Sequence, residues 1–164
     1  MSEASILRWF RDSAYGELVR DVYWLFPTLE ILHFLALCAL FGALLFMDLR
    51  VLGFNKAVPL SLTIRFVPVA LTAFALALVT GLGFFCSAPL DYWPNPSFRL
   101  KVLLILVAGA NALWFELSAR RTMRTLPPGA EMSHAARWSA GLSLTLWTTI
   151  IVLGRVLPYT GPSQ

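Results

Sequence analysis

The sequence predicts an all-α integral membrane protein, an antiparallel bundle of four transmembrane helices preceded by an N-terminal interfacial amphipathic helix. Of the 164 residues, 58% are hydrophobic, and the mean hydropathy is +0.71. Soluble domains are only about 45–50% apolar, so this composition favours a membrane protein. Four apolar runs each approach the roughly 20 residues that a helix needs to cross a bilayer. The connectors between them are short, which favours antiparallel neighbours.

The elements follow in order from the N-terminus. Residues 1–24 mix apolar side chains such as Ile6, Trp9 and Phe10 with charged ones, a pattern typical of a helix that lies in the membrane interface. Pro27 falls in the first turn of the next helix, where a missing N–H does no harm. The four-helix transmembrane domain is predicted over residues 25–159, with a tail at 160–164. Its spans are predicted at about 25–47, 66–88, 100–119 and 138–157.

The connectors predict the orientation. The first and third are rich in Lys and Arg, whereas the middle one, residues 87–96, has neither. The positive-inside rule therefore puts the first and third connectors in the cytoplasm and both termini in the periplasm of a bacterial inner membrane. We interpret the net charge of +4 as this topology signal together with contacts to the lipid bilayer, not as a nucleic-acid surface. The basic residues concerned are Arg50, Lys56, Arg65, Arg120, Arg121, Arg124 and Arg137.

Polar residues from three spans are predicted to meet near the outer face. Glu30 and His33 are three residues apart, so they share one face of the first span. Lys101 opens the third span and Arg155 lies in the last turn of the fourth. In the predicted topology these four side chains reach the same depth and form a polar pocket open to the outside.

Each of these residues also has a structural interpretation. Lys101 and Arg155 could be snorkelling residues that raise their charges to the interface. His33 is costly inside a bilayer, which favours a functional role, but it could also hydrogen-bond only to Glu30 or to a neighbouring helix. The remaining polar residues are expected to be structural: Asp48 and Arg50 as a local pair or topology signal, Asn111 as a helix–helix contact, and His134 as a surface residue.

Haem b is the first cofactor that this pattern predicts. A neutral imidazole is an axial ligand of haem iron, so His33 is the expected haem and metal ligand, with Glu30 as the group that orients it. The propionates need cations near the interface, and Lys101, Arg99 and Arg155 could supply them. Gly81 in the second span, together with Thr80 and Gly83, could leave room for a flat ring.

Two other ligands remain open. Copper(I) favours soft ligands, and Cys38, Met47 and Cys86 are available beside His33. A His–Glu pair near the interface could instead hydrogen-bond and protonate a quinone. The motifs of soluble enzymes, G-x-G-x-x-G, the Walker loop, H-E-x-x-H and G-x-S-x-G, are absent, so whether the chain is an enzyme is left open.

Four segments together resemble a bacterial four-helix membrane family known as a domain of unknown function: "LEILHFLALCALFGALLFMDLRVLGF", "TGLGFF", "NPSFRLKVLLI" and "LWTTIIVLGRVLPY". The resemblance runs from Phe26 to about Tyr159 and implies a fold but no activity. A looser resemblance connects His33 and Lys101 with CopD-type copper-resistance proteins and HemJ-type protoporphyrinogen oxidases. Likeness to the HemJ-type proteins implies b-type haem and porphyrin oxidation.

These observations combine into one expected function. The chain is expected to be a b-type haem-binding subunit that passes electrons between the quinone pool and a periplasmic or membrane redox partner, and a homo-oligomer is compatible with it. The alternatives are a copper-handling membrane transport protein and a cofactor-free structural or assembly subunit of a larger membrane complex. A haem protein would be red in mild detergent, and the other two would not.

Overall fold

The computed structural model describes residues 2–127 and 129–160, and their regular structure is entirely helical. Four helical segments are long and apolar enough to cross a membrane: Leu25–Leu52, Leu60–Ser87, Pro96–Thr125 and His134–Tyr159. The α-helices (α) and 3₁₀-helices (η) have these bounds: α1 Glu3–Arg11, α2 Ala14–Asp21, α3 Leu25–Leu52, α4 Leu60–Thr63, η1 Ile64–Phe66, α5 Val67–Ser87, α6 Pro89–Tyr92, α7 Pro96–Thr125, α8 His134–Val156 and η2 Leu157–Tyr159.

The four predicted spans are confirmed as helices, but their ends differ from the expected ones. α3 continues beyond residue 47, until Gly53 adopts a left-handed conformation with φ of 105° that suits glycine. α7 starts earlier and ends later than predicted because Asn95 caps its first turn and its last turns are polar but still helical. Apart from Thr160, the predicted tail at 160–164 lies outside the described residues.

The first 24 residues form two short helices where one was predicted. The Ser13 hydroxyl accepts a hydrogen bond from the Gly16 N–H and starts α2 immediately after α1 ends. α2 packs on α5, and α1 packs on α6. A Cβ on Gly16 would lie 2.8 Å from the Cys86 carbonyl oxygen, so this close approach of α2 to α5 requires glycine.

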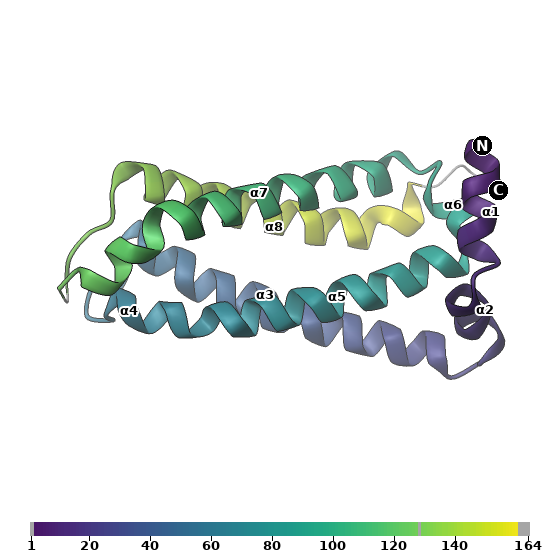
Figure 1. The fold of residues 1–164 in the computed structure, drawn as a ribbon, viewed down its shortest axis with the longest axis horizontal. Coiled ribbons are helices and arrows are strands. Elements are labelled where there is room, and N and C mark those ends of the chain that lie inside the picture. Colours follow the sequence, from purple (N-terminus) through teal and green to yellow (C-terminus); the bar gives the residue numbers. More distant parts are fainter. Residues whose placement is uncertain (1, 128, 161–164) are drawn as a thin grey trace.

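The long helices lie side by side, with short helices at both ends (Figure 1). α3 packs mainly on α5 and α8, and α7 packs mainly on α8. We call the end with α1, α2 and α6 the α6 end, and the end with α4 and the α7–α8 connection the α4 end (Figure 1). The predicted outer face corresponds to the α6 end and the predicted cytoplasmic face to the α4 end.

Small residues let the long helices approach closely. One buried cluster fills the middle of the molecule, and alanines contribute four of its eight members. Asn111 and Ser139 join α7 to α8, because the Asn111 Nδ2 donates to the Ser139 carbonyl at 3.1 Å and the Ser139 hydroxyl donates to the Asn111 Oδ1 at 2.8 Å. The prediction that Asn111 links two helices is therefore confirmed. The cluster comprises Leu40, Ala43, Ala70, Ala73, Ala108, Leu146, Trp147 and Ile150.

Candidate ligand-binding cavity

A cavity of about 300 Å³ lies near the α6 end, where residues of α5 and α7 face each other. α5 packs on α3, and α7 packs on α8, so the space between α5 and α7 is left to large side chains. The lining is almost entirely apolar, and its only ionisable members are His33 and Lys101. The lining residues are His33, Leu37, Phe74, Ala77, Leu78, Gly81, Leu82, Phe85, Trp93, Phe98, Lys101, Val102, Ile105, Trp147 and Ile150.

The His33 imidazole is held in one orientation by Thr80. The His33 Nδ1 lies 2.7 Å from the Thr80 hydroxyl, and that hydroxyl donates its single proton to the Leu76 carbonyl at 2.8 Å. When the hydroxyl donates to this carbonyl, it accepts from His33, and the imidazole proton is on Nδ1. The lone pair of the neutral ring is then on Nε2, and this nitrogen has no hydrogen-bond partner within residues 2–127 and 129–160.

Two neighbours on α5 complete the setting of this imidazole. Phe84 meets the His33 ring edge to face, with ring centroids 5.3 Å apart. Gly81 lies beside the ring, where a Cβ would come within 3.4 Å of the His33 Cε1. An added Cβ at position 81 would make ordinary van der Waals contact with the imidazole, so glycine leaves space beside the ring.

Lys101 lies on the α7 wall and reaches toward α8. Its Nζ would be 3.2 Å from a Cβ at Gly154, so the absence of a side chain at position 154 makes room for the ammonium group. Among the described residues Lys101 forms no ion pair or hydrogen bond. Its charge is therefore available to a ligand in the cavity.

Aromatic rings close the cavity toward the α6 end, and α5 leaves it open along the side. Phe85 and Phe98 stack with centroids 5.5 Å apart and planes 3° apart, and the Trp93 indole N–H donates to the Glu3 carboxylate. By contrast, Leu78 and Leu82 line the cavity while each is 48% exposed. The mouth of the cavity is thus apolar and lies on the lateral surface of the long helices.

The structure brings three of the six predicted cofactor residues together: His33, Gly81 and Lys101. Glu30, Arg99 and Arg155 are exposed and do not line the cavity. Arg155 stacks over the Tyr159 ring, with its guanidinium carbon 6.0 Å from the ring centroid.

The charge of Glu30 acts on Tyr92, and Glu30 forms no hydrogen bond with His33 among the described residues. Burial, followed by the charges of Asp91 and Glu30, raises the pKa of the Tyr92 hydroxyl. The hydrogen-bonding group that we expected Glu30 to supply to His33 is the Thr80 hydroxyl instead.

Several lining residues were not predicted. Phe85, Trp93 and Phe98 were missed because an aromatic residue near a helix end has the same appearance in a sequence whether it faces lipid or a cavity. Thr80 was expected only to leave room for a flat ring and not to hydrogen-bond His33. The signal that could have revealed this contact was its hydroxyl, which directly precedes Gly81 in the sequence. Gly83 does not face the cavity, since a Cβ there would lie 2.8 Å from the Tyr15 hydroxyl of α2.

The two cysteines lie away from the cavity. Cys38 is exposed, and Cys86 is buried beneath α2, where its carbonyl accepts a hydrogen bond from Arg20 at 3.4 Å. No group of three His, Cys, Asp or Glu side chains that could hold a metal ion is found in the part of the chain that the structure describes.

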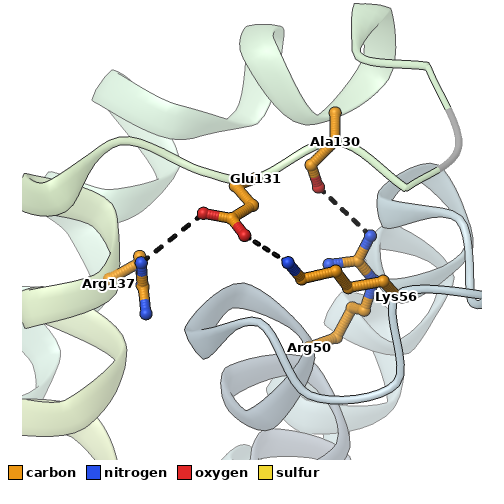
Figure 2. Close-up of polar contacts among 5 residues, drawn as sticks. All are labelled: Arg50, Lys56, Ala130, Glu131 and Arg137. Carbon is orange, nitrogen blue, oxygen red and sulfur yellow. Dashed lines mark hydrogen bonds and ion pairs between the residues drawn. The ribbon is translucent and has the colours of Figure 1, made fainter.

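A different set of charges lies at the α4 end (Figure 2). Arg50 is 3% exposed, and it donates from Nε to the Val58 carbonyl at 2.5 Å and from Nη2 to the Ala130 carbonyl at 3.3 Å. The expected local pair of Asp48 with Arg50 is wrong, because residues two apart on a helix point in different directions. Arg50 instead joins the two connectors of this end, and the Asp48 Oδ2 is buried without a partner among the described residues.

Comparisons with protein-family models, curated proteins and solved structures found no match to this chain.

Proposed function

We propose that the chain is a multi-pass membrane subunit that binds haem b in the cavity between α5 and α7 and takes part in electron transfer. The observation that carries this proposal is the contact of His33 Nδ1 with the Thr80 hydroxyl at 2.7 Å, which holds the imidazole at the cavity and leaves Nε2 without a partner among the described residues. A fixed imidazole with a free nitrogen, at an apolar cavity, is what an axial haem ligand requires.

The chemistry of the lining suits the group, and because a whole haem is larger than the cavity of about 300 Å³, part of the ring would extend through the lateral mouth. An almost wholly apolar lining suits a porphyrin ring, and Gly81 leaves space beside the imidazole. His33 would supply the axial nitrogen, and Lys101 would supply a positive charge for a propionate or, as a neutral amine, a second nitrogen ligand. When bound, haem would supply reversible one-electron transfer. Trp93, Phe85 and Phe98 would exclude water from the α6 end of the site.

Copper is less well supported as the resident cofactor. Copper(I) sites use soft sulfur ligands, and neither Cys38 nor Cys86 lines the cavity with His33. A copper-handling protein would lose function on substitution of Cys86. Haem binding in the cavity, by contrast, would be unchanged in Cys86→Ser, because Cys86 does not line the cavity.

The orientation in the membrane is part of the proposal. We propose an antiparallel four-helix bundle in a bacterial inner membrane with the α4 end in the cytoplasm, on the basis of the basic first and third connectors. The cavity would then lie in the outer half of the bilayer, with quinone and a periplasmic or membrane redox protein as partners. Membership of the four-helix family that the sequence resembles is proposed on the same segments.

The experiment is a titration of the purified protein in mild detergent with haem, followed by a reduced-minus-oxidised optical spectrum. We expect a Soret band and a sharp α-band in wild type that are lost in His33→Ala. His134→Ala is the matched control, because it removes the only other histidine and lies outside the cavity. A wild type that binds no haem, or a His33→Ala variant with the wild-type spectrum, would overturn the proposal.

A quinone in the same cavity is the second candidate. The specific observation is the lateral mouth, where Leu78 and Leu82 are each 48% exposed on the apolar surface that lipid would cover. A ring that carries a carbonyl could enter from the bilayer and accept hydrogen bonds near His33 and Lys101. A short-chain quinone should then quench the tryptophan fluorescence of the wild-type protein, and Lys101→Met should abolish this quenching. That result, together with the absence of haem binding, would favour this candidate.

A further inference from the structure

A second hollow, of about 380 Å³, lies at the α4 end between the end of α3 and the start of α8. Five residues line it, and they are of three kinds. Arg137 and His134 carry or can acquire positive charge, Trp138 is 80% exposed, and Leu52 and Gly141 form an apolar floor. A basic rim over an apolar floor, next to an exposed indole, is the composition of a site at a membrane–water interface.

The floor of the hollow is open. A Cβ at Gly141 would meet only the Leu52 Cδ2, at 4.0 Å, which is ordinary contact distance. Leu142, the next residue of α8, is 46% exposed and adds apolar surface outside the hollow. An acyl chain could therefore extend along α8 from this point without displacing a side chain.

Arg137 keeps hydrogen-bond donors for a ligand. Its nearest acidic partner is Glu131, at 3.7 Å between Nη1 and Oε2, which is too long for a hydrogen bond. The other Glu131 oxygen accepts a hydrogen bond from Lys56 (Figure 2). Glu131 therefore pairs with Arg137 only through this long ion pair, and most of the Arg137 guanidinium stays available to a ligand.

The start of α8 adds to the attraction for an anion. His134 is the first residue of this 23-residue helix. The Ser133 hydroxyl already accepts a hydrogen bond from the Ala136 N–H, and the N–H groups of His134 and Ala135 have no partner inside the helix. The helix dipole also favours negative charge at this end. An arginine, a histidine and a helix start thus converge on one hollow.

We propose that this hollow binds the phosphate group of an anionic phospholipid. Guanidinium groups pair with phosphate through two parallel hydrogen bonds, which makes Arg137 the principal contact. His134 adds a further donor, Trp138 lies at headgroup level, and an acyl chain covers the Leu52 and Gly141 floor. The site is separate from the haem cavity and does not depend on it.

The test is native mass spectrometry of the purified protein with phosphatidylglycerol. We expect a one-to-one adduct whose dissociation constant rises about tenfold in Arg137→Gln, a change of about 1.4 kcal/mol, because the variant loses a charge-assisted contact to the phosphate. Arg121→Gln is the matched control, because it makes the same charge change at an exposed position outside the hollow. Glu131→Gln should bind lipid more tightly, as it removes the competing carboxylate.

Two further binding experiments distinguish a lipid phosphate from free phosphate. Diacylglycerol has the same acyl chains without the phosphate, and its binding should be weaker and insensitive to Arg137→Gln. If inorganic phosphate stabilises the protein against heat, with the same dependence on Arg137 but no lipid adduct, the site is a phosphate site served from solution. Equal losses in Arg137→Gln and Arg121→Gln, or no loss in either, would overturn the proposal. Thermal melting of each variant separates lost binding from lost folding.

Discussion

At the α4 end Arg50 is 3% exposed, and its guanidinium donates to carbonyls of two connectors. At the α6 end, by contrast, Lys101 faces an apolar cavity without a partner among the described residues. Both residues carry a charge that is costly to remove from water. Two of the three Arg50 guanidinium nitrogens donate to backbone carbonyls, and the third is buried without a partner in the described part of the chain, whereas the Lys101 ammonium can bind a ligand in the cavity. The difference indicates how the role of a charged residue in a membrane helix can be inferred. A charge that has protein partners is structural, and a charge that has none is available to a ligand.

Removal of Arg50 should have the largest effect on stability. Arg50→Ala leaves the Val58 and Ala130 carbonyls without their charged donor, and we expect a loss of about 2–4 kcal/mol in the free energy of unfolding in detergent. Arg121→Ala, at an exposed position of α7, should change stability by less than about 0.5 kcal/mol. Ligand binding in the cavity should survive in the folded fraction. Similar losses of stability in Arg50→Ala and Arg121→Ala would mean that the two hydrogen bonds of Arg50 to the connectors do not stabilise the fold.

Thr80→Val should separate orientation of His33 from bulk packing. The substitution keeps the shape of the side chain but leaves the His33 Nδ1 without its partner, at an expected cost of about 1–2 kcal/mol. Affinity for the cavity ligand should fall about tenfold, because the imidazole can rotate. Thr149→Val is the control, since Thr149 is exposed on α8 and bonds only to the Thr145 carbonyl. Unchanged ligand affinity in Thr80→Val would mean that Thr80 does not fix the ring.

Lys101→Met should act in the opposite direction on stability. It replaces an unpaired ammonium by an apolar side chain of similar length, and we expect a gain of about 1 kcal/mol in stability together with weaker binding of an anionic ligand. Lys56→Met is the control, because it removes the only other lysine, whose partner Glu131 is exposed. A loss of stability in Lys101→Met would show that the ammonium has a structural partner.

The sequence was sufficient to predict the helices but not their surroundings. Apolar runs of about 20 residues identify membrane-spanning helices because hydrocarbon leaves few other structures possible. The same rule makes lipid-facing and cavity-facing apolar residues indistinguishable, so Phe85 and Phe98 could not be recognised as lining residues. His33 and Lys101 were found because ionisable groups are rare in such helices. Gly81 was found because small residues leave space.

The contacts that the sequence did not reveal also have physical causes. Glu30 is one turn from His33 and was therefore the nearest expected partner, but the face of α3 that carries His33 meets α5, and Thr80 supplies the hydroxyl there. The structural role of Arg50 could not be predicted because its partners are backbone carbonyls, which no sequence pattern reveals. Contacts between spans that are distant in the chain decided both outcomes.

The smallest expected effect concerns pH at the α4 end. The hydrogen bond and charge of Lys56, followed by the charge of Arg137, hold the pKa of Glu131 below its usual value of 4.5. Because this pKa is lower in the folded protein, its contribution to stability is fully present above about pH 4.5 and is lost as pH falls through the folded pKa. Glu131 is exposed, so solvent screens the interaction and the loss should be slight. The thermal midpoints of wild type and Glu131→Gln should therefore differ slightly near neutral pH and converge in acid. A difference that persists in acid would show that Glu131 acts through packing and not through its charge.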